Sequence, residues 1–194
     1  MKREKAQVLI RKHCVDKLTI EERKEFLESY WDSEIYSALE SFSECEIEKF
    51  PKALIHNMLS NEAPDDWHNK ELDVVLELVY EDYTRGYTNT YLMQLLQEIG
   101  IECHEIEGAP EPMEHCYCCF YLVFKPEDSF GSICPVCFWQ DAPGANRTTL
   151  EQARKNFKEF GASDQGSLEY VSKEALKMYS KHTLETQPIN TQQS

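Results

Sequence analysis

Residues 116–137 read CYCCFYLVFKPEDSFGSICPVC and decide how this part of the 194-residue chain folds. They contain two C-x-x-C pairs with fourteen residues between them. A C-x-x-C turn brings two sulfurs to one side of a tight loop, and two facing turns supply the tetrahedral four-thiolate shell of a closed structural zinc site. The sequence therefore predicts one Zn²⁺ bound by Cys116, Cys119, Cys134 and Cys137. Four thiolates leave no open position for a catalytic water.

The segment between the two pairs predicts a hairpin. Residues 120–124 have the composition of a strand, residues 125–128 that of a turn, and residues 129–133 that of a second strand. Such a hairpin would return the second cysteine turn to the first. Phe120, Phe138 and Trp139 are expected to form the apolar wall around the metal.

One ligand has an alternative in the sequence. Cys118 could replace Cys119 by changing the first turn from C-x-x-C to C-x-C, although the turn geometry favours Cys119. His104 and His115 are possible nitrogen ligands, but a histidine beside a complete four-sulfur set is more often a surface or packing residue. The remaining thiols are predicted to be buried small hydrophobes: Cys14, Cys45 and Cys103.

Residues 1–100 predict a bundle of helices separated by capping signals. Thr19-Ile20-Glu21-Glu22 is a capping box, Pro51 suits the first turn of a helix, and Thr88 is expected to cap a helix that ends at Gly100. The periodicity also predicts a helix from Ser33 to about Phe42 and another over residues 69–83.

The pattern changes after Gly100. Residues 101–106 alternate in a way that predicts a short strand, and the Pro- and Gly-rich segment 108–112 is the expected boundary. A capping box at Thr148–Glu151 predicts a helix closed by Gly161, followed by a last amphipathic helix from Leu168 to Tyr179.

The predicted fold class is therefore α+β, with an N-terminal helical bundle, a small zinc-ribbon-like β-hairpin module and C-terminal helices. The predicted domains are an acidic helical domain over residues 1–108, a ribbon module with helices over 109–182, and a disordered tail over 183–194.

Acidic residues are concentrated in the first of these domains. The chain has a formal net charge of −15. Residues 1–108 hold 12 Lys and Arg against 24 Asp and Glu, whereas residues 109–194 hold 8 against 11. Nucleic acids and anionic membranes require basic surfaces, so the charge favours an electropositive protein partner instead.

The cysteine usage and the hydropathy pattern both indicate a cytoplasmic protein. No apolar run has the length of a signal peptide or of the roughly 20 residues of a membrane span. Five of the eight cysteines lie within residues 116–137, which in a reducing compartment is better explained by metal than by disulfides.

No catalytic motif accompanies the cysteines. The chain has no Gly-rich phosphate loop, no G-x-S-x-G and no H-E-x-x-H, so we expect no enzymatic activity. Zinc ribbons often bind nucleic acid, but few basic residues are available here for a basic face, and we expect no such partner. The available basic residues are Arg147, Arg154, Lys155 and Lys158.

The order and spacing of several motifs resemble the bacterial cysteine-rich CPCC family. The resemblance covers about residues 115–162 and rests on CYCCF at 116–120, ICPVCFWQD at 133–141, GAN at 144–146, LEQARKNF at 150–157 and FGA at 160–162. Tyr117 stands where the family has proline, and Phe120 stands where it usually has glycine. A bulky Phe120 is not expected to adopt the left-handed geometry often found after the second cysteine.

This resemblance implies a zinc-ribbon-like module without an established enzymatic activity. It also implies an immunity protein that neutralises a cognate toxin, because members look like small proteins encoded beside polymorphic toxins. The alternative is a zinc-ribbon adaptor or a nucleic-acid-associated regulatory protein. In this interpretation the acids of residues 1–108 steer the partner. Three aromatic residues are candidate anchors beside the acids, although the sequence favours a core position for each: Trp31, Trp67 and Tyr87.

Overall fold

The computed structural model describes residues 1–33, 50–60, 64, 66–126 and 129–182 of the chain. The predicted helix from Ser33 to Phe42, the thiol of Cys45 and the tail from residue 183 therefore lie outside the described residues. The chain divides into two compact units. The first contains residues 1–85 and 92–108, and the second contains residues 86–91 and 109–194.

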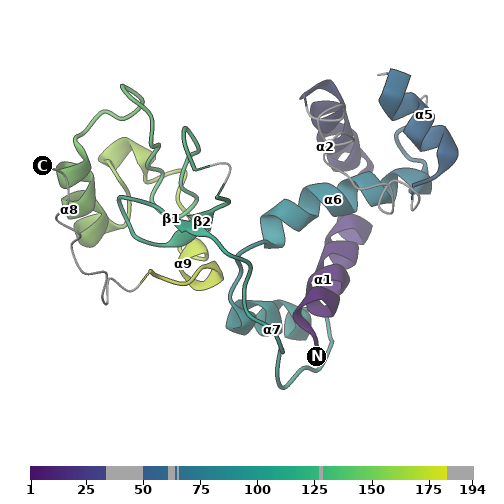
Figure 1. Ribbon diagram of the computed structural model, residues 1–194, viewed down its shortest axis with the longest axis horizontal. Coiled ribbons are helices and arrows are strands. Elements are labelled where there is room, and N and C mark those ends of the chain that lie inside the picture. Colours follow the sequence, from purple (N-terminus) through teal and green to yellow (C-terminus); the bar gives the residue numbers. More distant parts are fainter. Residues whose placement is uncertain (34–49, 61–63, 65, 127–128, 183–194) are drawn as a thin grey trace, which may run out of the picture. The chain divides into compact units, whose positions relative to one another are not determined.

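The first unit is helical (Figure 1), and its helices begin and end close to the capping and terminating residues of the sequence. Lys52 follows Pro51, and the helix over 89–98 precedes Gly100, which has a positive φ of 79°. The elements are α1 (Arg3–Lys17), α2 (Ile20–Ser33), α5 (Lys52–Ser60), the 3₁₀ turn η1 (Lys70–Leu72), α6 (Asp73–Thr84) and α7 (Asn89–Glu98), whose residues up to Tyr91 belong to the second unit.

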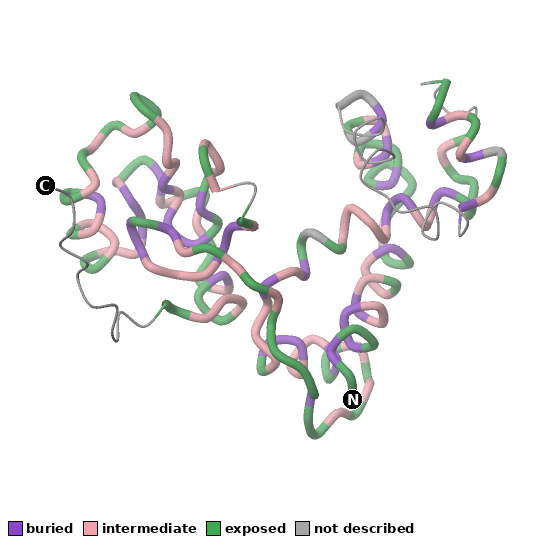
Figure 2. The backbone as a smooth tube through the Cα atoms, viewed as in Figure 1, coloured by how far each residue is buried: buried purple, intermediate pink, exposed green. Residues whose placement is uncertain are grey.

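The core of the first unit forms where α6 packs against α1 and α2. Apolar side chains at helical spacing on α6 meet those of α2 and α5, and Trp67 packs edge-on against the buried Trp31 with ring centroids 6.1 Å apart. Trp31 is therefore a core residue and does not provide an exposed anchor. Figure 2 colours buried residues purple along the helices. The buried set of this core is Val15, Leu27, Trp31, Phe50, Leu54, Met58, Leu72, Val75 and Leu76.

The predicted capping box opens α2. The Thr19 hydroxyl accepts a hydrogen bond from the Glu22 N–H at 3.2 Å, and the Glu22 carboxylate accepts one from the Thr19 N–H at 2.8 Å. The backbone bond, assisted by the Thr19 hydroxyl, lowers the pKa of Glu22. The box therefore holds the start of α2 most firmly when Glu22 is ionised.

The predicted strand over residues 101–106 is wrong. Inside this segment the Glu105 carbonyl accepts a hydrogen bond from the Met1 ammonium at 2.7 Å, and a parallel bridge joins Lys2 to Glu107 just beyond it, with Arg3 N–H donating to the Glu107 carbonyl at 2.9 Å. A strand needs a partner along its length, and the pairing partner here turns into α1 at Arg3.

The second unit contains the two-stranded antiparallel sheet, β1 (Glu114–His115) and β2 (Leu122–Phe124). Glu114 pairs with Phe124 and His115 with Leu122, so one extra residue bulges on β2. The sheet confirms an α+β fold but differs in detail from the predicted hairpin. The strands flank the first cysteine turn, and described residues 129–133 contribute only an isolated bridge from Ile133 to Gln140 across the second turn.

The C-terminal part of the second unit lies along this sheet. Segment 178–182 bonds to β2 through Leu122 N–H to the Ser180 carbonyl at 2.9 Å. Helix α8 (Leu150–Phe160) begins after Thr149, which replaces the expected Thr148 as the cap, and ends at Gly161 with a positive φ of 89°. The predicted long last helix is wrong, because the described residues form only the turn η2 (Gln165–Ser167) and the short α9 (Ala175–Met178).

Candidate metal centre

The first cysteine turn is held by its own backbone. The Phe120 N–H donates to the Cys116 carbonyl at 2.9 Å and closes the loop. The Cys118 N–H points at the Cys116 sulfur at 3.4 Å. An N–H directed at a sulfur stabilises the thiolate form that binds metal.

The second turn repeats this geometry. The Phe138 N–H donates to the Cys134 carbonyl at 2.8 Å, and the Val136 N–H points at the Cys134 sulfur at 3.4 Å. One more backbone hydrogen bond joins the residues before and after each turn. The Cys116 N–H donates to the Tyr121 carbonyl, and the Cys134 N–H donates to the Trp139 carbonyl. The chain therefore builds the same cysteine turn twice.

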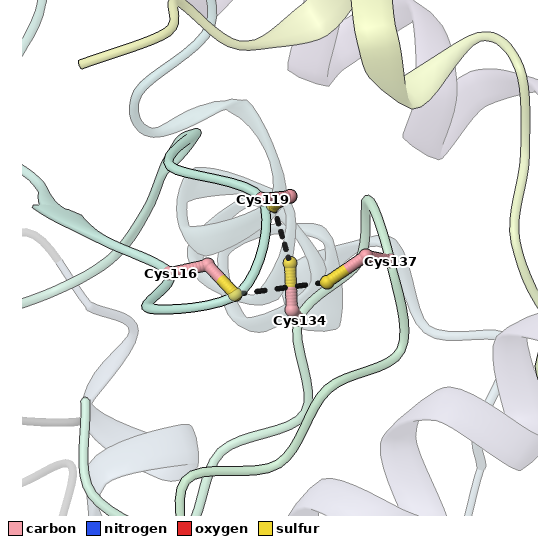
Figure 3. Close-up of side chains that lie close together, drawn as sticks. All are labelled: Cys116, Cys119, Cys134 and Cys137. Carbon is pink, nitrogen blue, oxygen red and sulfur yellow. Dashed lines mark hydrogen bonds between the residues drawn. The ribbon is translucent and has the colours of Figure 1, made fainter. Parts of the chain in front are cut away.

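The two turns face each other and bring four sulfurs together (Figure 3). All four cysteines are buried, and their Sγ atoms lie within 4.8 Å of one another. The Cys116–Cys137 and Cys119–Cys134 sulfur pairs are each separated by 3.6 Å. A disulfide requires about 2.05 Å, so these thiols are not cross-linked. A tetrahedral shell with metal–sulfur bonds of about 2.3 Å places its sulfurs about 3.8 Å apart, close to the observed spacing.

The electrostatics of the cluster also favour a bound cation. Burial raises the pKa of Cys134 well above its usual value, and hydrogen bonding to Cys116 raises that of Cys137. Four buried sulfurs this close together cannot all carry a negative charge without a cation beside them, because each charge disfavours the ionised form of its neighbours. The donor set of four buried sulfurs is thus consistent with a metal site, whose ligands would lose their protons on binding.

The surroundings of these cysteines have a counterpart among known families. Residues 114–177 match the family Cysteine-rich CPCC. The match confirms the resemblance and extends it past Ala162 into α9. No curated protein and no solved structure matches the chain. Among the described residues, no helix combines the length and apolar character needed to cross a membrane.

The CPCC region, as we call residues 114–177, departs from expectation at Phe120. Its φ is 64°, and Phe138 at the equivalent place in the second turn has a φ of 63°. The left-handed conformation costs a non-glycine residue roughly 1–2 kcal/mol. The turn therefore overrides the preference of both phenylalanines, and the left-handed geometry that a bulky Phe120 was expected to disfavour is present.

Contacts from other segments of the second unit support the two cysteine turns. The sequence did not indicate these contacts. The Cys137 carbonyl accepts a hydrogen bond from Ser163 N–H at 2.7 Å, and the Phe120 carbonyl accepts one from His182 N–H at 2.7 Å. Arg154 on α8 donates to the Tyr117 carbonyl at 3.0 Å and lies over the Phe120 ring. These contacts hold each turn in its left-handed form.

The expected apolar wall is only partly as predicted. Trp139 is buried in the core around the cysteines, together with Val136 and Ala153 of α8. Phe120 and Phe138 are only half-buried, with their rings stacked against His115 and Tyr170, respectively. The two phenylalanines thus serve partly as surface residues.

The other candidate ligands lie outside the cluster. His104 is 90% exposed, and His115 stacks against His182 with centroids 4.8 Å apart. Cys14 and Cys103 are partly exposed and not fully buried as predicted, and burial raises the pKa of the Cys14 thiol.

Cys118 is buried beside the cluster but does not belong to it. Its backbone N–H contributes to the first turn, whereas Cys119 supplies the sulfur that faces Cys134. We expect Cys118→Ser to retain the metal and Cys119→Ser to lose it, since only the latter removes one of four donors. Metal content per chain, measured by elemental analysis, checks this. Metal loss in Cys118→Ser with retention in Cys119→Ser would mean that the first turn binds as C-x-C.

Proposed function

We propose that this chain is a non-catalytic, zinc-binding interaction protein that acts as an immunity protein by binding and blocking a basic bacterial toxin in the cytoplasm. The donor chemistry supports zinc, because four sulfurs in a tetrahedral arrangement suit Zn²⁺ and leave no position for substrate. An Fe–S cluster would use the same donors, so elemental analysis decides the metal.

The observation that carries the proposal is the charge of residues 1–108, which hold twice as many acids as bases. Several acids on α2 are exposed, and within the described residues Glu21 and Glu25 have no ion-pair partner. A partner that acts on nucleic acid must itself be electropositive. Attraction between the two would raise the association rate and would weaken with salt.

The decisive experiment is identification of the partner followed by a protection assay. A pull-down with the full chain in its native host, read by mass spectrometry, should recover a basic protein. Co-expression should then protect cells from that protein. If no complex forms at low salt and co-expression gives no protection, the immunity proposal is wrong and an acidic adaptor remains.

Charge reversal tests the steering role. The double variant Glu21→Lys and Glu25→Lys should slow association with the partner by about tenfold at low salt and reduce its salt dependence. Stopped-flow or surface-binding kinetics measure both quantities. The matched control is Glu114→Lys with Glu159→Lys, two exposed acids of the second unit that should change the rate much less. Equal changes in association rate for the two double variants would mean that net charge, and not the position of Glu21 and Glu25 on α2, sets the rate.

A further inference from the structure

A cavity of about 320 Å³ opens beside the second cysteine turn, within the second unit. Its volume lies at the lower end of the range for small-ligand sites, about 300–1,000 Å³. The side chains that define its chemistry come from the turn, the loop before α8 and the segment around η2. They are Ile133, Phe138, Arg147, Asp164, Glu169 and Tyr170.

One side of the cavity is apolar and open to solvent. The Phe138 ring stacks on the Tyr170 ring with centroids 4.9 Å apart and planes 21° from parallel. Tyr170 is 62% exposed and Ile133 is 47% exposed. Phe138 contributes its ring from a left-handed backbone, where glycine would be less strained. The second cysteine turn sets this conformation, and it places an aromatic side chain at the cavity wall.

The cavity also carries two opposite charges without partners. Neither Arg147 nor Glu169 forms an ion pair within the described part of the chain, although the arginines Arg11 and Arg23 of the first unit each do. Arg147 lies against Gly166, where a Cβ atom would meet its Nη1 and Asp164 Oδ1, each at 3.2 Å. The absence of a side chain at this position therefore gives the guanidinium its place.

The third charged residue of the cavity is already satisfied. Asp164 Oδ1 accepts hydrogen bonds from Gly166 N–H at 2.8 Å and Ser167 N–H at 3.1 Å, and Oδ2 accepts one from the Ser167 hydroxyl at 2.9 Å. Its carboxylate fixes η2 and is not free for a ligand. The cavity therefore presents one available cation, one available anion and an aromatic wall.

We propose that this cavity binds a free α-amino acid with an aromatic or branched apolar side chain. The α-carboxylate would pair with Arg147 and the α-ammonium with Glu169, while the side chain packs on Ile133, Phe138 and Tyr170. A peptide terminus carries only one of the two charges, whereas a free amino acid carries both, together with the side chain, on one carbon. The inference goes beyond the proposed function, since it concerns a small ligand of the second unit and does not depend on any protein partner.

Ligand analogues test each contact separately in the metal-loaded full-length protein. Phenylalanine and leucine are titrated by calorimetry and by amide chemical shifts, beside phenylalaninamide, which lacks the carboxylate, and N-acetylphenylalanine, which lacks the ammonium. Loss of a charged hydrogen bond should weaken binding by at least about tenfold for either derivative. Shifts should concentrate on residues 133–147 and 164–170. Failure of both amino acids to bind at millimolar concentration, or equal affinities for all three phenylalanine compounds, would overturn the proposal.

Two variants assign the contacts to residues. Arg147→Gln should abolish the preference for phenylalanine over phenylalaninamide, and Glu169→Gln should abolish the preference over N-acetylphenylalanine. The matched controls are Lys158→Gln and Glu159→Gln, an exposed cation and anion on α8 outside the cavity, which should leave both preferences intact. Metal content confirms that each variant is folded at the cysteine cluster. If both preferences survive in Arg147→Gln and Glu169→Gln, the cavity is not the binding site.

Discussion

Removal of the metal is expected to unfold the second unit while the helices of the first unit remain. Structural Zn²⁺ contributes about 10–16 kcal/mol in small zinc modules, as much as or more than the whole stability of an ordinary domain. The core of the second unit is built around the cysteines themselves, with Val136, Trp139 and Ala153 packed against them. Four thiols without metal would lose the charge that holds this core together.

The fold of the first unit is not expected to depend on the metal. Its core contains Val75, Leu76 and their neighbours on α2 and α5, and none of the four cysteines. Hydrogen exchange before and after chelation checks the prediction residue by residue, since protection should be lost over 109–182 and retained in α1, α2 and α6. Cys103→Ser serves as a control, because that thiol lies outside the cluster and its loss should alter neither the metal nor the exchange. Loss of protection in α2 and α6 on chelation would mean that both units unfold as one.

The helices were predictable because their signals are local. A capping box, a proline or a terminating glycine acts on residues within one turn, and Thr19, Pro51 and Gly100 each mark an end in the structure. The four cysteines were predictable for a similar reason, because each C-x-x-C pair encodes its own turn. The number of residues between the pairs only has to let the turns meet.

The errors fall where distant residues decide the outcome. Segment 101–106 has the alternation of a strand, yet its partner is the N-terminus, more than one hundred residues away, and the pairing stops where α1 begins. The apolar stripe from Leu168 to Tyr179 has helical spacing, but segment 178–182 bonds to β2 instead. Backbone pairing to distant residues limits the strand pattern of the first segment and ends the helix at Met178 in the second.

Phe120 and Phe138 illustrate the same principle at the cysteine turns. Propensity rules disfavour a phenylalanine with positive φ, because its Cβ crowds the carbonyl oxygen. Hydrogen bonds to the carbonyls of Cys137 and Phe120 from remote segments hold the conformation regardless. No pattern within the cysteine stretch reveals these donors, Ser163 and His182.

A large loss of folding stability is expected when an ion pair of the first unit is broken. The Arg23 side chain is 7% exposed, and its Nη1 donates to Asp73 at the start of α6, while Nη2 donates to the Asn69 carbonyl at 3.3 Å. Asp73→Asn keeps the shape and removes the charge, which leaves a buried guanidinium without a counter-ion. Breaking a buried pair from one side costs about 3–5 kcal/mol, and the 24% exposure of Asp73 places the expected loss near the lower limit.

Lys70 supplies the matched control, because it approaches the same carboxylate at 3.5 Å but is 72% exposed. Lys70→Gln should cost less than about 1 kcal/mol, since solvent screens such a pair. Urea unfolding followed by circular dichroism measures both variants, and metal content should stay unchanged because the change lies in the first unit. Equal losses for the two variants would mean that α2 and α6 are held by apolar packing alone. A reduced metal content in Asp73→Asn would instead couple this pair to the cysteine cluster and contradict the independence of the units that the chelation experiment predicts.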